Sequence, residues 1–444
     1  MKIIKSALLL AFAALVSLPL TGCGSSSTQT IPLTETIFYA HTILFGNHST
    51  LVASGYNAYG QLGDGSLNGS SSFHQVTTAT GMTTVSGYSA GANHSLAFHN
   101  YTVWSWGSNF QSRLGVGTTV PDTGITAYSA RPLPIVMHSA GTDSPVTAVA
   151  AGWVHSLALK GDTVWSWGDN TYGELGNSTS TSVNPTLTPS PVLGVGGAGT
   201  TLSGIGAIAA GGGHSLALSS DKMTIYAWGY NNYGQAGQGP VAPAAAPTFE
   251  PTPKPVALPS DVAGIPYRIA AAGSYSLVLL DNGDVLGWGF NGYGQLGNKV
   301  ATPTRDPVYV PVHVVTADGR QLNDPANTAT MGKVVQISAG TMFVLARTDK
   351  GKVYAWGYNL KGQLGTGTNE LNITYAVPAT TINAVADANF PGVTDILAVG
   401  DTSLAKIGNT WYGWGDYGWG QLGLPVPNNA VAYLLEPMAI PMPQ

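Results

Sequence analysis

Short apolar runs bounded by turn residues follow one another along the whole chain. Val146 to Ala150, Ile205 to Ala209 and Val334 to Ser338 are such runs, and clusters of glycine, asparagine and proline separate them from the next. Short runs between turn signals indicate strands, while amphipathic helices need longer stretches with a different period. We therefore predict an all-β fold in which helix is scarce.

A dipeptide marks an internal repeat within this pattern. Trp-Gly recurs along the chain, with Ser54-Gly55 as a degenerate first copy, and its tryptophans are Trp106, Trp167, Trp228, Trp288, Trp356 and Trp414. The seven copies lie about 52 to 68 residues apart, which is the range of propeller blades. A turn such as Tyr56 to Gly63 follows each dipeptide, and its Asn and Gly residues tolerate the backbone that tight turns need.

Each repeat contains four predicted strands. The run before Gly152 is the first, a run such as Gly152 to Leu159 is the second, and the run that ends in Trp-Gly is the third. A fourth strand with proline at its edge recurs as Leu133 to Met137, Pro191 to Val195, Lys254 to Leu258 and Tyr309 to Val315. Four strands in each of seven repeats predict a seven-bladed β-propeller.

The two ends of the chain suggest how the ring closes. The last copy has no fourth strand until Glu436 to Pro441, and the first copy begins with a strand near Thr36 to Ala40. We therefore expect the N- and C-terminal strands to share one blade, because such closure removes free sheet edges.

The composition narrows the function. Only 9% of the residues are charged and the net charge is −5, while 58 Gly and 28 Pro supply the turns. No basic field is present that would attract phosphates, so we expect no nucleic-acid partner.

The N-terminus predicts export and a lipid anchor. Lys2 and Lys5 precede an apolar run from Ala7 to Leu20, which is the pattern of a signal peptide. The run ends in Leu20-Thr21-Gly22-Cys23, which resembles the lipobox of bacterial lipoproteins, and Cys23 is the only cysteine. We predict a signal peptide over 1–22, a lipidated Cys23 and flexible tether over 23–34, and the propeller over 35–444. Gly24 after the cysteine favours the outer membrane or cell surface over the inner membrane.

The repeat motifs carry a family resemblance. A strand of the form Ala-Gly-x-x-His-Ser-Leu-Ala-Leu and a turn of the form Trp-Gly-x-Asn-x-x-Gly-Gln-Leu-Gly resemble the repeats of the regulator of chromosome condensation family, over about residues 35 to 444. The resemblance implies a seven-bladed propeller. The founding activity of that family is guanine nucleotide exchange, but this chain has an export signal and no basic tail. A secreted bacterial propeller of similar repeat type inhibits β-lactamases through aromatic-rich loops, which implies a binding module.

Several repeated residues are candidates for chemistry. We interpret the six tryptophans as residues that pack between blades, because burial of each indole contributes about 4 to 6 kcal/mol of transfer free energy. His41, His94, His155 and His214 occur one per blade and lack the clustered spacing of a ligand set, so we expect no metal and no cofactor. The remaining histidines are scattered, and no catalytic set can be assigned.

Aromatic residues in the turns are the candidates for binding. They share two positions of the turn and are Tyr56, Tyr59, Tyr172, Tyr230, Tyr233, Phe290, Tyr293, Tyr358 and Trp419. Equivalent positions project on one face, and aromatic side chains on a nearly uncharged face suit recognition. Alternatively, half of these rings only cover their own turns.

We predict a lipid-anchored protein that binds a protein partner as a scaffold or inhibitor. The alternatives are a glycan-binding module, for which Asp169 and Asn170 lie beside Tyr172 in the chain, an exchange-like regulator, or a propeller hydrolase or lyase. The enzyme is disfavoured because the carboxylates are spread through the turns.

Overall fold

The fold is described from a computed structural model of the chain. It describes residues 40–46, 50–77, 82, 84–117, 127–135, 137, 144–197, 199–239, 249–300, 306–387, 392–426 and 432–443. The chain divides into two units, Met1–Phe38 and Tyr39–Gln444, and all described residues belong to the second. Cys23 and the predicted signal peptide and tether therefore lie outside the described residues.

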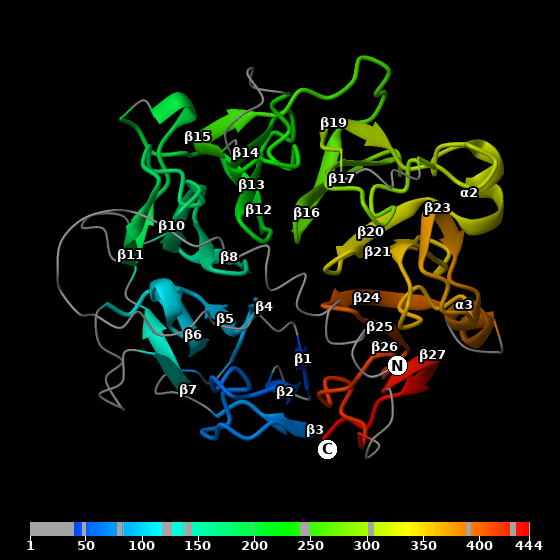
Figure 1. The fold of residues 1–444 in the computed structure, drawn as a ribbon, viewed down its shortest axis with the longest axis horizontal. Coiled ribbons are helices and arrows are strands. Elements are labelled where there is room, and N and C mark those ends of the chain that lie inside the picture. Colours follow the sequence, from blue (N-terminus) through cyan, green and yellow to red (C-terminus); the bar gives the residue numbers. More distant parts are fainter. Residues whose placement is uncertain are drawn as a thin grey trace, which may run out of the picture. The chain divides into compact units, whose positions relative to one another are not determined.

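Seven antiparallel sheets are arranged radially around one axis (Figure 1), which confirms the predicted seven-bladed propeller. Six blades have four described strands in sequence order, and blade 1 has three, β1, β2 and β3. Of the strand predicted near Thr36 to Ala40, only Ala40 is described, and it lies outside any strand.

The strands fall into four classes by their position in the blade. The first strands lie nearest the axis in Figure 1 and are β4 (Gly87–Ala90), β8 (Val146–Ala151), β12 (Ile205–Ala210), β16 (Pro266–Ala272), β20 (Val334–Ala339) and β24 (Val393–Val399). The second strands are β1 (His41–Phe45), β5 (His94–His99), β9 (His155–Lys160), β13 (His214–Ser219), β17 (Tyr275–Leu280), β21 (Phe343–Thr348) and β25 (Thr402–Ile407). The third strands are β2 (Leu51–Gly55), β6 (Thr102–Ser108), β10 (Thr163–Asn170), β14 (Ile225–Tyr230), β18 (Val285–Gly289), β22 (Val353–Tyr358) and β26 (Thr410–Asp416). The outer strands are β3 (Ser70–Gln75), β7 (Tyr128–Ile135), β11 (Thr181–Pro191), β15 (Phe249–Pro255), β19 (Val308–His313), β23 (Asn372–Pro378) and β27 (Tyr433–Ala439).

Helix is scarce among the described residues, as predicted. Two short α-helices, α2 (Pro325–Met331) and α3 (Thr380–Asp387), lie in connections that follow the outer strands of blades 5 and 6. Asp324 caps the first of them by accepting a hydrogen bond from the backbone N–H of Ala326.

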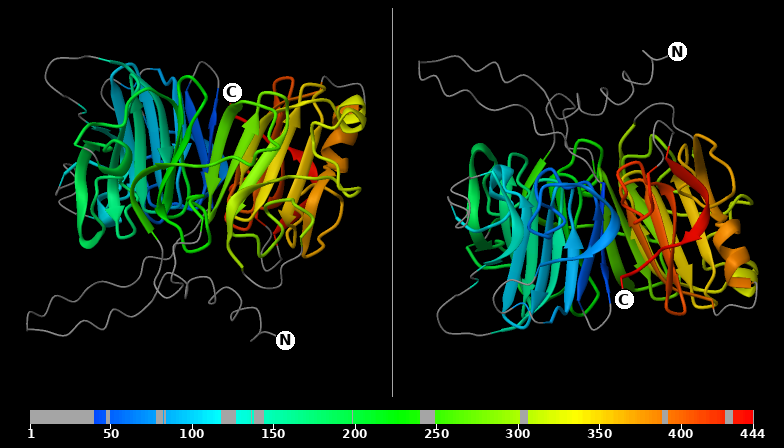
Figure 2. Two further views of the ribbon diagram at one scale, coloured as in Figure 1. Left: turned by 90° about the horizontal axis from the view of Figure 1, so that it is seen from above. Right: turned by 90° about the horizontal axis from the view of Figure 1, so that it is seen from below.

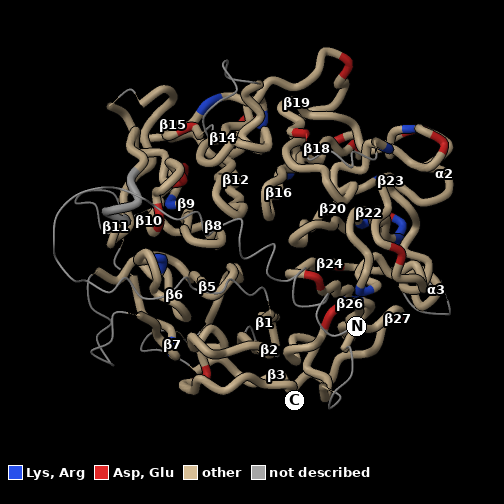
Figure 3. The backbone as a smooth tube through the Cα atoms, viewed as in Figure 1, with Lys and Arg blue, Asp and Glu red and all other residues tan. Residues whose placement is uncertain are grey.

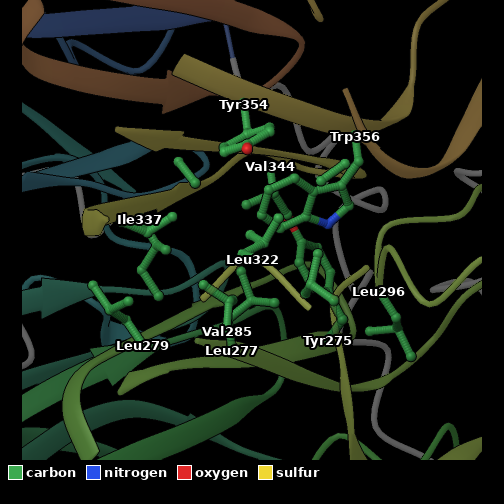
Figure 4. Close-up of a cluster of buried hydrophobic side chains, with 14 residues drawn as sticks. Tyr275, Leu277, Leu279, Val285, Leu296, Leu322, Ile337, Val344, Tyr354 and Trp356 are labelled. Carbon is green, nitrogen blue, oxygen red and sulfur yellow. The ribbon is translucent and has the colours of Figure 1, made fainter. Parts of the chain in front are cut away.

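Hydrophobic packing lies between the blades. Among the described residues there are seven buried clusters, and each combines side chains of two adjacent blades. Figure 4 shows the cluster between blades 5 and 6, where Tyr275 and Leu277 face Val344 and Trp356. A single blade therefore cannot bury its own faces, and the fold depends on its neighbours.

One hydrogen-bond arrangement joins each blade to the next. The six repeat tryptophans are fully buried, and each indole N–H donates to a turn carbonyl of the preceding blade, as Trp228 Nε1 does to the Glu174 carbonyl at 2.7 Å. In five blades a serine of the second strand donates to the same carbonyl, as Ser215 Oγ does at 2.9 Å. In the degenerate first copy Ser54 Oγ replaces the indole and donates to the Gln421 carbonyl at 3.1 Å.

The structure corrects the predicted ring closure. β27 pairs with β26 in blade 7, and β3 is the outer strand of blade 1, so no sheet of described strands combines the two ends of the chain. β27 joins the strand that precedes it in sequence, as every other outer strand does. The ring closes instead by packing, because Phe73 and Leu44 of blade 1 lie in one buried cluster with Leu404 and Trp411 of blade 7.

The predicted outer strands Leu133 to Met137 and Tyr309 to Val315 overlap β7 and β19, but in blades 3 and 4 the strands were predicted too far along the chain. In blade 3 the strand is Thr181–Pro191 instead of Pro191 to Val195, and in blade 4 it is Phe249–Pro255 instead of Lys254 to Leu258. Proline indicated a strand boundary in the sequence, whereas these prolines lie inside the outer strands. An edge strand tolerates proline where its N–H would face outward.

A matched pair of serines tests the junction. Ser215→Ala should lower the midpoint of thermal unfolding by more than Ser403→Ala. Both hydroxyls donate to a turn carbonyl, but only Ser215 also lies within hydrogen-bond distance of a buried histidine, with His155 Nε2 at 2.9 Å. At blade 6 the histidine position is Phe343, which has no donor.

Loss of Ser215 therefore leaves the imidazole N–H unsatisfied, which costs about 1 to 3 kcal/mol, whereas a hydrogen bond lost alone costs about 1 kcal/mol. Equal shifts for the two variants, measured by circular dichroism melting at neutral pH, would show that the histidine does not depend on the serine.

Candidate functional site

The turns after the third strands all lie at one end of the ring, and we call this end the turn face. It is formed by residues 56–63, 108–115, 169–176, 230–237, 290–297, 358–365 and 416–423. The edge-on views of Figure 2 show the strands running between this end and the opposite one. Each turn is held by its own side chains, as where Asn57 Oδ1 accepts from the Leu62 N–H and Gln61 Oε1 from the Tyr59 N–H.

The candidate aromatic residues meet at the blade junctions. The ring at the fourth position of one turn contacts the ring at the first position of the next, with centroid distances of 4.6 Å for Tyr172–Tyr230, 5.0 Å for Tyr233–Phe290, 5.2 Å for Tyr293–Tyr358 and 5.1 Å for Trp419–Tyr56. Rings of the same turn also touch, as Tyr56 and Tyr59 do at 6.4 Å. The rings therefore form two arcs, one over blades 3 to 6 and one over blades 7 and 1.

These rings are partly exposed. Phe290 is 8% exposed and Trp419 is 47% exposed, and the tyrosines of the two arcs are half-buried. Burial raises the pKa of Tyr230 and of Tyr358 to about 12, so both phenols are neutral donors near neutral pH. The rings thus cover the blade junctions, and all of them except Phe290 are also partly open to solvent.

A charged junction separates the arcs between blades 6 and 7. Lys361 takes the fourth turn position, and its ammonium nitrogen lies 3.0 Å from Asp401 Oδ2 and 2.5 Å from Asp416 Oδ2. Burial disfavours the charged lysine, but the two carboxylates outweigh it and raise the pKa of Lys361 above its usual value. This ion cluster was missed in the sequence, although a lysine at an aromatic repeat position could have indicated it.

Charged residues also replace the turn glutamine in blades 2 and 3. Arg113 and Glu174 take this position and are fully buried. Glu174 Oε2 accepts from the Tyr172 N–H at 2.8 Å, as the glutamine oxygen does elsewhere, and Oε1 has no hydrogen-bond partner among the described residues. Burial, together with the nearby Asp169, raises the pKa of Glu174 well above its usual value. The neutral acid therefore stands in for glutamine.

The polar residues considered for a glycan site form hydrogen bonds within their own turn. Asn170 is 2% exposed, accepts from the Leu175 N–H and donates to the Thr179 carbonyl. Asp169 is 7% exposed and accepts from the Thr171 hydroxyl. Only Tyr172 of the three remains half-exposed, so the turn lacks the polar groups that would orient a sugar.

The four histidines point to serines. Nε2 of His41, His94, His155 and His214 lies 2.9 to 3.0 Å from a serine hydroxyl of the next blade. Burial lowers the pKa of His41 to about 4 and, as the largest cause, that of His155 and His214 to about 3, so they are neutral near pH 7. In the described part of the chain no three His, Cys, Asp or Glu side chains lie close enough to hold a metal ion.

Charge is sparse over the described ring (Figure 3). Within the described ranges, no helix is both long enough and apolar enough to cross a membrane.

The buried acid predicts a pH effect. Glu174→Gln should leave thermal stability nearly unchanged at pH 4 and raise it at pH 7 to 8. A carboxyl whose pKa is raised by folding stabilises the fold fully below its unfolded value, which is 4.5 here, and this stabilisation declines as the pH rises above that value. The measurement is the unfolding midpoint against pH for wild type and variant.

Gln235→Glu is the matched control, because Gln235 makes the same contact with the Tyr233 N–H in the next blade. The Gln235→Glu variant should lose stability above about pH 5, because ionisation of the new buried carboxyl favours the unfolded chain. Parallel pH profiles for wild type and Glu174→Gln would mean that Glu174 is ionised in the folded protein.

The repeats match a known family model. The regulator of chromosome condensation (RCC1) repeat matches residues 102–159, 162–218, 282–347 and 350–398, and a second model of the same repeat matches 146–174, 207–235, 268–295 and 334–363. The Arabidopsis thaliana ultraviolet-B receptor UVR8 is 28% identical over 374 residues, 83% of this chain and 70% of the receptor. The human E3 ubiquitin-protein ligase HERC2 is 28% identical over 72% of this chain but only 6% of the ligase.

Solved structures show the same fold. Human WBSCR16 superposes with a TM-score of 0.70 at 22% identity, covering 89% of this chain and 95% of that one. Prp20p of Saccharomyces cerevisiae superposes with a TM-score of 0.66 at 23% identity, covering 83% and 80%. Repeat models and fold agree: the chain belongs to the regulator of chromosome condensation (RCC1) repeat family.

Proposed function

We propose that this protein is a lipid-anchored scaffold or inhibitor of the cell envelope that binds a protein partner through the turn face. The observation that carries the proposal is the two arcs of rings on this face, over blades 3 to 6 and over blades 7 and 1, in which every ring except Phe290 is half-buried or exposed. Neighbouring rings hold one another in place, so binding would cost little side-chain entropy.

The charges at the turn face support a protein partner over catalysis. Lys361, Asp401 and Asp416 neutralise one another in an ion cluster, and Asp169 is used by its own turn. The four strand histidines, His41, His94, His155 and His214, are buried against serines. General acid–base catalysis needs groups within reach of a substrate, and these groups are committed elsewhere.

Relatives of the same fold bind proteins. The structure of Prp20p is described with its binding to Gsp1p and histones, and another structure shows yeast RCC1 bound to Kap60. We do not carry these partners or an exchange activity to this chain, because those structures are less than 25% identical and fold does not fix function. The HERC2 match covers 6% of that ligase, so ligase activity is not carried over either.

The turn face should bind through its most exposed ring. Trp419→Ala should weaken capture of the partner strongly while lowering the unfolding midpoint little, because the indole is 47% exposed and contacts Tyr56 at one edge. Met223→Ala is the control: Met223 is 69% exposed and follows β13, at the opposite end of the blades. Partners are captured by photocrosslinking to a chain that begins at Gly24.

The position of the crosslinker maps the face. A photoreactive residue at Asn232, which is exposed in the turn of blade 4, should capture the partner, and one at Lys222, at the opposite end of the same blade, should not. Capture from Lys222 alone, or binding unchanged by Trp419→Ala, would contradict the proposed face.

Lipid attachment at Cys23 is tested separately. Cells grown with radiolabelled palmitate should yield a labelled protein, and Cys23→Ser should remove both the label and the membrane fraction of the protein. A labelled Cys23→Ser protein or an unlabelled wild type would exclude the anchor, while leaving the turn face untouched.

A further inference from the structure

The outer strand of each blade is an edge, and blade 1 differs from the others there. The seven outer strands can be aligned on one register position. In each blade, this is the outer-strand residue that pairs with the third-strand residue three positions before the Trp-Gly glycine. In β3 this residue is Gln75, opposite Val52. The equivalents are Pro134, Pro191, Pro255, His313, Pro378 and Ala439 in blades 2 to 7.

Two residues earlier, proline recurs again. Phe73 stands at this position in blade 1, and the equivalents are Pro132, Pro189, Pro253, Pro311, Ala376 and Pro437. Every blade from 2 to 7 therefore has proline at one or both positions, whereas β3 has none. Proline at an edge removes the donor that another strand would use.

Both positions direct their backbone N–H away from the blade. The ladder bond lies at the residue after Gln75, because the Val76 N–H donates to the Leu51 carbonyl at 2.9 Å. Donors alternate along an antiparallel strand, so Gln75 and Phe73 face the other way. Ala376 shows this directly, because its N–H donates to the Val315 carbonyl, outside its own ladder.

A main-chain bond found at several junctions is also missing at blade 1. At three of the six turns that have this glycine, the fifth residue after it donates to the outer strand of the next blade, as Gly65 does to Ala130, Ser178 to Pro251 and Lys299 to Thr374. In blade 7 the turn glycine is Gly420, which lies against Ser71 of β3, and the fifth residue after it is Pro425. Proline cannot donate, so this bond to the Ser71 carbonyl is not made.

A polar groove runs along this edge. Asp64, Ser66, Asn68, Gly69, Ser70, His74 and Gln75 line it. Ser72, His74 and Gln75 are exposed, while Phe73 is buried and anchors the strand in the cluster between blades 7 and 1. Asp64 is the acidic side chain of the groove, and hydroxyl, amide and imidazole groups make up the rest.

We propose that the β3 edge is a docking site for an extended segment of a partner protein, which adds to blade 1 as a further strand. The N–H and C=O groups of Phe73 and Gln75 supply the main-chain bonds, as in other cases of strand addition. The hydroxyl, amide and imidazole groups of the groove select a segment with Ser, Thr or Asn side chains, since Asp64 already accepts from the Ser66 N–H and hydroxyl. This site lies outside the turn face, and it stands or falls independently of the function proposed above.

The test uses a proline already tolerated at this register. Gln75→Pro removes the outward donor, and proline stands at the equivalent position in four other blades, so the blade should still fold. Gln75→Ala removes the side chain and keeps the donor. The probe is a displayed library of random peptides of about ten residues, a full strand length, selected on the wild-type chain that begins at Gly24.

Selected peptides should bind wild type and Gln75→Ala alike and lose about tenfold or more in affinity on Gln75→Pro, since a main-chain bond is lost and the proline ring intrudes. Peptide binding should also slow hydrogen exchange of the Phe73 and Gln75 amides. Peptides that bind all three chains equally, or protect neither amide, would overturn the proposal. So would a wild type that dimerises without peptide while Gln75→Pro stays monomeric, because the occupant would then be a second copy.

Discussion

A buried backbone carbonyl shared between neighbouring blades is the constraint on which the rest of this ring depends. A carbonyl oxygen at the end of each turn accepts from the next blade, from an indole in six cases and from Ser54 in the seventh. A buried carbonyl without a donor would cost free energy, so the turn of one blade and the third strand of the next must keep their register together. The largest side chains of the core are thereby oriented as well as buried, and each of the seven apolar clusters forms around a fixed point.

This constraint acts on the backbone of the turn and leaves its side chains free to differ. The glutamine position can hold Arg113 or Glu174, because the shared acceptor is the carbonyl and not the side chain. The fourth turn position holds tyrosine, tryptophan, Gln111 or Lys361, and in blades 3 to 7 its side chain meets the first position of the next turn. The turn face is therefore a surface whose geometry is repeated and whose chemistry can change blade by blade, which is what a specific binding surface requires.

The sequence predicted the features that recur and missed those that depend on departures from the repeat. Six Trp-Gly copies and the degenerate Ser54-Gly55 were sufficient to predict the propeller, because the repeat period indicates the number of blades. The outer strands of blades 3 and 4 were placed too late, since Pro189 and Pro253 lie inside these strands and not at their boundaries. Ring closure was predicted from an apparent shortage of strands, whereas contact between Phe73 and the side chains of blade 7 has no signature in one sequence. The pairing of rings across junctions could not be predicted from the sequence, because the two partners lie about one repeat apart in the chain.

Blade 1 differs from the repeat in three ways, and all three lie at or beside its junction with blade 7. Ser54 replaces the indole, Pro425 replaces a donor to the outer strand, and neither outward position of β3 is proline. This junction is held by apolar packing, by the ring contact of Tyr56 with Trp419 and by the Ser54 hydrogen bond, because no described sheet combines strands of blades 7 and 1. Phe73 and Trp411 supply apolar contact in exchange, and that contact fixes the strand without covering its edge. Phe73 fixes β3 in place, while the outward N–H groups of the strand are not replaced by proline. Such an edge can pair with a further strand, whereas each of the other six blades has proline at one or both of these positions.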